Sequence, residues 1–428
     1  MTVLVAGAGP AGLVAAAELA LAGVEVEVVD AAARRGSHPR GFTLSARSLE
    51  LLDRRGIVDR FLAEGPAVPY GMFLPGVFLD LSVMDTDHPY TLGIAQNRVE
   101  ELLEEWLAEF GVRVRWGQEV VDLAQDPDGV DVVVGGQHRR FSYLVGCDGS
   151  RSVVRRRAGI AFPGVDASSY GLIADVEADY DALATGEVFV LPRPGYVRIV
   201  LEEPEPRSGP VEVEYVRELL TARLGREVEL GKPLWLSRFS DAARQAERYV
   251  HGRVVLAGDA AHVHPPAGAV GVNVALADAV NLGWKLAATV SGRAPDGLLQ
   301  TYHDERHPVG ARVLRTTRAQ SMLGREDLAP VRDLLADLNG KRLAELVAGL
   351  DTRYDPRIPG DHPLLGRLAP NRPVVVDGRT TSIAELLRPG RPVLLPDDGG
   401  MLIRPDGHVA WVADPATLSA ALQTWTGP

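Results

Sequence analysis

The chain has 428 residues, 46% hydrophobic and 24% charged, a composition that suits a globular protein of two or three domains. Its net charge of −12 is spread out without a long basic run, which argues against a nucleic-acid-binding protein. No apolar run reaches the roughly 18 residues of a membrane span, and no basic segment precedes the apolar N-terminus, so we expect neither a membrane anchor nor a signal peptide. Cys147 is the single cysteine, which excludes an internal disulfide and a cysteine-rich metal site and fits a cytoplasmic protein without bound metal.

The first thirty residues predict a strand, a glycine turn, a helix and a second strand that bind a dinucleotide. An apolar run over residues 2–6 precedes Gly7, Gly9 and Gly12, which have the G-x-G-x-x-G spacing. The first glycine permits a sharp turn, the second lets the backbone approach a pyrophosphate, and the third lets the helix pack closely on the strand. The second strand ends at Asp30, whose carboxylate accepts hydrogen bonds from a ribose and disfavours a 2′-phosphate. The expected ligand is therefore FAD or NAD rather than NADP.

The segment that follows contains further candidate cofactor contacts. Arg40 lies in a polar loop, where it either approaches the cofactor or is solvated. Residues 66–95 are rich in glycine, proline and aromatic residues and resemble part of a sheet on the substrate side. Gln96 and Arg98 come directly before a strong helical pattern over residues 99–110, and Gln96 is expected at the N-terminal edge of that helix.

Two more apolar strands end on an acidic residue. The run Tyr143–Gly146 leads into Asp148 and Gly149, where a carboxylate and free backbone N–H groups are expected to face a nucleotide. A second run, VVLA, leads into Gly258 and Asp259, and Asp259 is placed to accept hydrogen bonds from the ribityl hydroxyls of a flavin. Three acids at three strand ends predict one binding edge of a parallel sheet.

The loop after Asp259 is a candidate for the edge of the flavin ring. A long apolar helix begins near Val272, and its N-terminal dipole is expected to stabilise negative charge on a reduced flavin. The candidate contacts in this loop are Pro266, Gly271, Val272 and Asn273. For His262 and His264 we expect a role in loop packing rather than in catalysis.

Residues 170–245 predict an antiparallel insertion that forms a roof over a ligand cavity. Several stretches alternate with period two, including VEVEYV at residues 211–216, and each is predicted to be a strand. A helix is expected over residues 217–224. Aromatic side chains that are candidates for the cavity wall are Phe189, Tyr196, Trp235 and Phe239.

The three motifs G-x-G-x-x-G, Asp-Gly and Gly-Asp, in this order, resemble the class A flavoprotein monooxygenases over most of the chain. The stretches WLSRFSDAARQAERY, GDAAHVHPPAG, DAVNLGWKLA and TYHDERHPVGARVL are more narrowly similar to the aromatic polyketide hydroxylases. The resemblance implies an α/β fold: a Rossmann-like FAD-binding domain, an inserted α+β substrate domain with a mainly antiparallel sheet, and a shortened thioredoxin-like C-terminal region. The expected boundaries are 1–165 with 246–325 (including part of the substrate-side sheet at 66–95), 166–245 for the insertion, 326–371 for a helical connection and 372–428 for the C-terminal region.

The same resemblance implies the chemistry. FAD is bound non-covalently, NADPH or NADH is a transient co-substrate, and a flavin C4a-hydroperoxide hydroxylates a polycyclic aromatic substrate in antibiotic biosynthesis. By residue correspondence, Gln96, Arg98 and Asp259 contact FAD, and Asp148 serves both FAD and NAD(P)H. A monomer or homodimer is expected.

Two departures from the family pattern and several alternatives stay open. In the family loop P-P-x-G-G-Q-G-x-N, this chain has Ala269 and Val270 in place of glycine and glutamine. Its middle segment and its C-terminal part are also shorter than is usual in the family. Residues 372–428 contain no cysteine, which excludes thiol redox chemistry in the tail. The alternatives are a Baeyer–Villiger or ring-rearranging oxygenase, a catabolic phenol hydroxylase, and a flavin-binding accessory protein without turnover. A flavin halogenase is disfavoured because a W-x-W-x-I-P segment is absent.

Overall fold

The computed structural model describes residues 1–74, 77–205, 207–323, 326–395 and 400–426. Its centre is a six-stranded sheet with the order β19-β20-β12-β1-β2-β8, in which the neighbours from β20 to β8 pair in parallel and β19 is antiparallel. The strands are β1 (Thr2–Ala6), β2 (Glu25–Asp30), β8 (Val114–Trp116), β12 (Tyr143–Gly146), β19 (Val250–His251) and β20 (Val254–Leu256). Because parallel strands end at the same edge, the acids that follow β2, β12 and β20 meet there.

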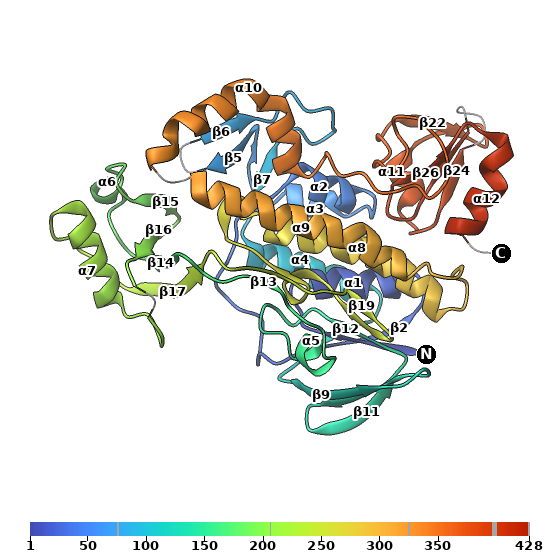
Figure 1. Cartoon of the computed structure of the whole chain (residues 1–428), viewed down its shortest axis with the longest axis horizontal. Helices are drawn as coiled ribbons and strands as arrows, with labels where there is room; N and C mark the ends of the chain where they lie inside the picture. Colours follow the sequence, from blue (N-terminus) through green and yellow to red (C-terminus); the bar gives the residue numbers. More distant parts are fainter. Residues whose placement is uncertain (75–76, 206, 324–325, 396–399, 427–428) are drawn as a thin grey trace.

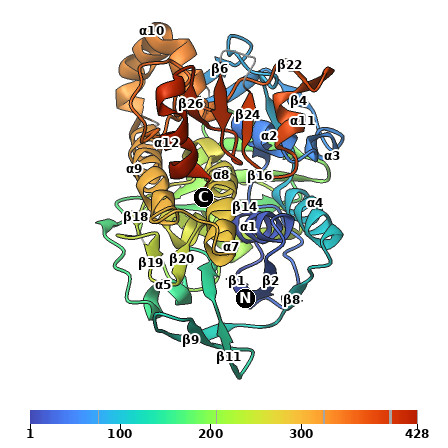
Figure 2. The ribbon, with the colours of Figure 1, turned by 90° about the vertical axis from the view of Figure 1, so that its right-hand side faces the viewer.

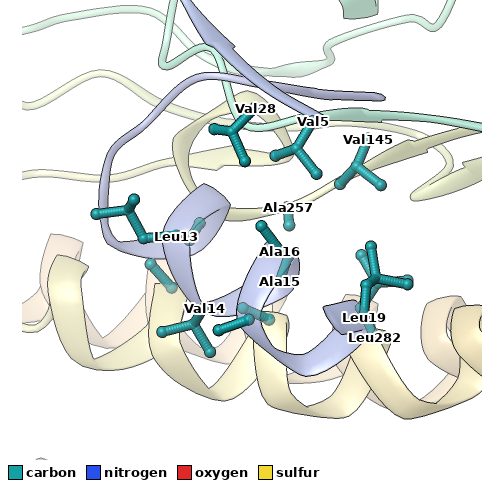
Figure 3. Close-up of a cluster of buried hydrophobic side chains, with 14 of the residues drawn as sticks. Val5, Leu13, Val14, Ala15, Ala16, Leu19, Val28, Val145, Ala257 and Leu282 are labelled. Atoms are coloured by element: carbon teal, nitrogen blue, oxygen red, sulfur yellow. The ribbon is translucent and has the colours of Figure 1, made fainter. Parts of the chain in front are cut away.

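Helix α1 (Pro10–Leu21) packs between this sheet and the long helix α8 (Gly271–Val290), with α4 (Gln96–Glu109) beside it. Figure 3 shows Val5, Val28 and Val145 of the sheet directed toward α1, and Leu282 of α8 against Leu19 of α1. A Cβ on Gly283 of α8 would overlap the side chain of Glu18. Glycine at this position therefore allows the two helices to approach closely.

The middle domain is built on a four-stranded antiparallel sheet with the order β15-β16-β14-β17 (Figure 1). Its strands and helices are β14 (Tyr170–Val176), α6 (Tyr180–Leu183), β15 (Phe189–Arg193), β16 (Tyr196–Glu203), α7 (Val213–Leu224) and β17 (Pro233–Ser240). One face of the sheet packs its aliphatic residues against Val216 and Leu220 of α7. The strand predicted at residues 211–216 is therefore wrong from Val213 onward, because Val213, Val216 and Leu220 continue with helical spacing and bury one face of α7.

Residues 66–95 form strands of two small units, and Met72, Phe73 and Leu74 of the second unit line the cavity described below. Strands β3 (Thr43–Leu44), β7 (Thr91–Gly93) and β4 (Ala67–Val68) form a small sheet, and β5 (Tyr70–Leu74) pairs with β6 (Val77–Asp80) in a separate hairpin. Among the described residues, neither unit pairs with the sheet of the middle domain. The hairpin instead packs its apolar side chains against α10 (Ala329–Ala348).

The remaining elements surround this frame. They are α2 (Ala46–Asp53), α3 (Val58–Leu62), β9 (Val120–Gln125), β10 (Val130–Val134), β11 (Gln137–Phe141), α5 (Val153–Arg157), β13 (Gly164–Val165), β18 (Ala243–Gln245), β21 (His262–Val263) and α9 (Gln300–Leu323). The C-terminal region contains β22 (Pro373–Val376), β23 (Arg379–Ser382), α11 (Ile383–Leu387), β24 (Val393–Leu395), β25 (Met401–Ile403), β26 (Val409–Val412) and α12 (Pro415–Trp425). It lies at the end of the molecule opposite the middle domain (Figure 1). In the part of the chain that the structure describes, no helix combines the length and the hydropathy that crossing a membrane requires.

A buried ion-pair cluster attaches the C-terminal region to α8 and α9, on the side seen in Figure 2. Glu305 of α9 accepts two hydrogen bonds from Arg404, at 2.6 and 2.8 Å, and one from Lys285 of α8 at 2.8 Å. Asn281 donates to the same carboxylate at 2.7 Å, and Asp406 accepts from Arg404 at 2.5 Å. Burial opposes the ionisation of Glu305, but Arg404 and Lys285 together hold its pKa at about 2. Charge pairing therefore contributes to attaching the C-terminal region to α8 and α9.

We predict that Glu305→Gln lowers the free energy of unfolding by about 3–5 kcal/mol, because Arg404 and Lys285 then lose their shared counter-charge inside the protein. The pKa of Glu305 is lowered from 4.5 to about 2, so its stabilising contribution is complete above pH 4.5 and is lost as the pH falls toward 2. Denaturant unfolding across the acid range measures this, and the gap between variant and wild type must narrow as the pH falls.

The matched control is Asp304→Asn on the same helix. Asp304 pairs with Arg357 at 2.5 Å on the surface, and we expect a change of about 1 kcal/mol or less. Equal destabilisation by the two substitutions would contradict a special role for the buried cluster.

Candidate flavin and substrate site

A cavity of about 1780 Å³ extends from the acidic edge of the central sheet to the sheet of the middle domain. Ligand pockets usually measure about 300–1,000 Å³, so this volume suits a dinucleotide together with a second ligand. The predicted site residues that line it are Gly7, Gly9, Asp30, Arg40, Gln96, Asp148, Gly149, Gly258, Asp259, Pro266, Gly271 and Val272. Three predicted residues, Gly12, Arg98 and Asn273, are outside this lining.

The three glycines of the first turn have different surroundings. Gly7 adopts φ +105°, and a Cβ there would overlap the carbonyl of Cys147. A Cβ on Gly12 would overlap the carbonyl of Gly7, whereas no atom lies within 4 Å of the position that a Cβ on Gly9 would take. Gly7 and Gly12 are thus required by the protein itself, and Gly9 keeps an open space in the cavity.

The start of α1 next to this space suits an anion. Gly9 is its N-cap residue and no side chain caps it, so the first N–H groups of the helix and its dipole are available to a phosphate. The arrangement of Gly9, a bare helix start and an acid at the end of β2 fits the pyrophosphate and ribose of a dinucleotide.

The three acids are held in different ways. Asp30 accepts backbone N–H groups from Ala8 and Ala32, both at 2.8 Å, which orients its carboxylate at the end of β2. One oxygen of Asp148 accepts N–H groups at the start of α5, and its other oxygen is buried without a partner among the described residues. The exposed carboxylate of Asp259 makes no hydrogen bond within the described part of the chain and faces the cavity. Asp148 and Asp259 therefore retain acceptor capacity for a ligand.

Arg98 does not reach the cavity, unlike Gln96. Its guanidinium pairs with Glu64 at 2.8 Å and with Glu101 at 2.9 Å. Residues two apart on a helix point to different sides, so the start of α4 presents Gln96 to the cavity and turns Arg98 toward other acids. This geometry does not match the FAD contact expected for Arg98.

Asn273 also differs from the expectation for the flavin edge. Its side-chain oxygen accepts from the backbone N–H of Ser45 at 2.8 Å and from the hydroxyl of Ser48 at 2.7 Å. The amide therefore connects the first turn of α8 to the first turn of α2, and Asn273 is not among the residues that line the cavity.

The loop before α8 contains a strained residue. Ala269 adopts φ +51°, in the left-handed region that favours glycine, and such backbone strain costs on the order of 1–3 kcal/mol. Gly268 beside it has φ +72°, and the amide of Gln320 lies 3.2 Å from the position that its Cβ would take. The structure thus keeps the loop in a glycine-like conformation although the glycine of the family pattern is replaced. No local sequence pattern indicated Gln320, because this contact spans about fifty residues.

The two histidines of this region have different surroundings. His262 is buried, and its Nε2 contacts Asp278 at 2.6 Å, while Arg306 donates to the other oxygen of Asp278 at 2.6 Å. His264 lines the cavity and contacts the carbonyl of Pro265 at 2.7 Å, and burial lowers its pKa. Burial also raises the pKa of the Cys147 thiol, which disfavours its thiolate.

The four predicted aromatic wall residues separate into two pairs. Phe189 and Phe239 line the cavity. Tyr196 and Trp235 are covered by the loop between β2 and β3, whose His38 lies 5.7 Å from the Tyr196 ring and stacks at 5.4 Å on Trp235. The sequence named all four as candidates for the cavity wall, but it did not indicate that a loop from the other domain would contact Tyr196 and Trp235.

The whole arrangement agrees with comparisons to known proteins. The model of a family described as an FAD-binding domain matches residues 1–317, and that of the aromatic-ring hydroxylase C-terminal region matches residues 395–428. The chain belongs to the FAD-dependent aromatic-ring hydroxylases, the class A flavoprotein monooxygenases. Its resident cofactor is therefore FAD, and NAD(P)H is the co-substrate typical of this enzyme family.

Several relatives of this monooxygenase cover nearly its whole length. A 12-dehydrotetracycline 5-monooxygenase/anhydrotetracycline 6-monooxygenase of Streptomyces rimosus is 40% identical over 100% of this chain and 99% of its own. The crystal structure of CabE, an aromatic hydroxylase from angucycline biosynthesis, has a TM-score of 0.93 at 39% identity and covers 100% and 99% of the two chains. A dialkyldecalin synthase of Streptomyces rugosporus is 38% identical over 100% and 99%.

We predict that Gly9→Ala leaves the fold intact but weakens FAD binding by tenfold or more, because the new methyl enters the space kept for the cofactor at a cost of about 1–3 kcal/mol. Its backbone angles, φ −77° and ψ −178°, suit alanine. The melting temperature of the apoprotein and a fluorescence titration with FAD measure the two effects. Gly340→Ala is the control, since Gly340 in α10 also has no atom within 4 Å of an added Cβ. We call Gly7, Gly9, Gly12 and the start of α1 the dinucleotide cradle. Unchanged FAD affinity in Gly9→Ala would contradict the binding of the FAD pyrophosphate at this cradle.

We also predict that Asp259→Ala weakens FAD retention by about tenfold without loss of stability, because its carboxylate has no partner within the described protein and is available to the ribityl chain. Flavin content after gel filtration provides the measurement. Asp296→Ala, at an exposed position outside the cavity lining, is the matched control. Full FAD occupancy in Asp259→Ala would show that Asp259 does not contribute to FAD binding.

Proposed function

We propose that this enzyme hydroxylates a polycyclic, polyketide-type aromatic substrate in the biosynthesis of an antibiotic or similar secondary metabolite. The observation that carries the proposal is the size of the cavity, about 1780 Å³, which extends beyond the dinucleotide cradle to the sheet of the middle domain. A single phenol ring needs far less space than this. The names of relatives that act on tetracycline intermediates or belong to angucycline biosynthesis support the same substrate class.

The cradle residues have a holding role. Gly9 and the start of α1 receive the pyrophosphate, Asp30 receives a ribose, and Asp148 and Asp259 orient the rest of the cofactor by hydrogen bonds. Bound FAD supplies hydride acceptance from NAD(P)H and activation of O₂ for transfer of one oxygen atom to an electron-rich ring. The N-terminus of α8, near Gly271, stabilises negative charge at the adjacent ring edge.

The middle domain has the role of positioning the substrate and excluding water. The register of its sheet places Phe189, Leu191, Ile173 and Val200 on one face, and all four line the cavity together with Phe239. A flat apolar wall of this kind suits a fused aromatic ring system and keeps water away from the reacting centre. No protein nucleophile is required, because the cofactor carries the oxygen chemistry.

The rival functions use the same scaffold. A Baeyer–Villiger or ring-rearranging oxygenase would use the same cradle and cavity, and a catabolic phenol hydroxylase would not need so large a space. The relative that is a dialkyldecalin synthase has the same length and similar identity, so product analysis is the decisive measurement. The proposal holds with either NADPH or NADH as the co-substrate, and for either a monomer or a homodimer.

The test is incubation of the holoenzyme with NADPH or NADH, ¹⁸O₂ and a panel of polycyclic phenols, with a single-ring phenol for comparison. We expect substrate-stimulated NAD(P)H oxidation and a product heavier by one ¹⁸O atom, with all rings intact on fragmentation. Ring opening or lactone formation would favour the Baeyer–Villiger alternative. An isomer of unchanged mass, formed without NAD(P)H, would overturn the proposal.

A further inference from the structure

Arg193, a cationic side chain in the cavity, has no hydrogen-bond or ion-pair partner among the described residues. Arg193 ends strand β15, pairs across the hairpin with Tyr196, and lines the cavity. Its guanidinium stacks on the ring of Phe42, with Cζ 3.8 Å from the ring centroid. Its Nε is buried without a hydrogen-bond partner, and no ion pair to Arg193 is found among the described residues. The side chain is thus half-buried and positioned by stacking alone.

The neighbouring arginines of the same sheet are fully paired. Arg198 donates to both oxygens of Asp175 at 2.7 Å and also to two carbonyls of the loop between β2 and β3. Arg238 donates to Glu203 at 2.8 Å. Asp175 is the carboxylate that attracts Arg193, but its oxygens already bind Arg198 and His38. Asp175 is therefore already engaged, and Glu202, another acid of this sheet that lines the cavity, forms no ion pair with Arg193.

The charges around Arg193 make the lack of a counter-ion costly. Burial lowers its pKa, and the positive charge of Arg198 lowers it further, while Tyr196 and Asp175 act in the opposite direction. A desolvated charge without a partner is unfavourable in a folded protein. Such a group is retained where a ligand supplies the missing partner, as many functional sites show.

The surroundings of Arg193 indicate the chemistry of that ligand. Phe189 and Leu191 lie on the same face of β15, four and two positions before Arg193, and form part of the apolar wall. A flat ring system lying on this wall would bring one edge to the guanidinium. Arginine binds planar oxyanions through charge-assisted hydrogen bonds, and phenolates or enolates conjugated to an aromatic ring are such groups.

We propose that Arg193 binds an acidic oxygen of the aromatic substrate, as a phenolate or enolate, and thereby fixes the orientation of its ring system in the cavity. This rests on the proposed function, because it deepens the substrate class from polycyclic aromatic to polycyclic aromatic with an ionisable hydroxyl. Arg193 belongs to the middle domain rather than to the glycine cradle, and its role is in substrate binding rather than in FAD binding.

The test measures binding to the oxidised holoenzyme without NAD(P)H. The probes are 1,2-dihydroxyanthraquinone, whose red anion absorbs at longer wavelength than flavin, and neutral 1,2-dimethoxyanthraquinone. We expect the wild type to bind the first as its anion, with the ionisation midpoint of the bound dye lowered by about one pH unit. In Arg193→Met the lowering should disappear and affinity for the acidic dye should fall about tenfold, with affinity for the neutral dye unchanged. Arg193→Lys should retain part of the effect.

Arg226→Met is the matched control, since it removes an exposed charge outside the cavity lining that donates to the carbonyl of Ala182 in the same domain. We expect it to keep wild-type affinity for both dyes. Equal loss of both dyes in Arg193→Met would indicate a packing role and overturn the proposal, as would loss of FAD or undiminished binding of the anion. Because no turnover is measured, failure of hydroxylation affects the proposed function alone.

Discussion

The close backbone approach of Gly12 to the carbonyl of Gly7 determines the geometry on which the rest of this enzyme depends. It seats α1 directly on β1, and Gly7 in turn lies against the carbonyl of Cys147, so that β12 and the glycine turn are in contact. No larger residue fits at either position. The result is a helix start and several strand ends at one edge of a parallel sheet, with Gly9 left open toward the cavity.

Charge pairing connects the outer parts of the molecule to this centre. The C-terminal region is attached through Arg404, whose two acidic partners, Glu305 and Asp406, are buried with it. On the other side, Asp175 binds Arg198 and His38 and so joins the middle domain to the loop that follows β2. Buried ions of this kind are stable only when they are fully paired. Arg193, which has no acidic partner among the described residues, differs in this respect from Arg198 and Arg238.

The loop before α8 shows how the fold can preserve a conformation after its usual residue is lost. Ala269 is held at φ +51° against the preference of alanine for negative φ, and its N–H donates to the carbonyl of Pro266. Asn273, which the loop pattern placed at the ring edge, instead closes the gap between α8 and α2. The departure of this chain from the family pattern is thus accommodated locally, while the first turn of α8 keeps its place at the cavity.

The sequence alone determined the cofactor-binding half of this protein. Glycine spacing, apolar runs and terminal acids are local signals, and each of Asp30, Asp148 and Asp259 stands at the strand end where its motif predicted it. Tertiary structure decided which side chains reach the cavity, because that depends on helix rotation and on contacts between segments far apart in the chain. Helix geometry turned Arg98 toward other acids.

Burial likewise decided whether a stretch with an ambiguous local pattern forms a helix or a strand. Val216 and Leu220 needed the sheet beneath them, so an alternating stretch became a helix. The loop of Phe42 covered Tyr196 and Trp235 and stacked on Arg193, a contact that no local pattern predicts. Local chemistry thus determined where the glycine turn and the strand-end acids lie, and long-range packing decided the shape and the charge of the rest of the cavity.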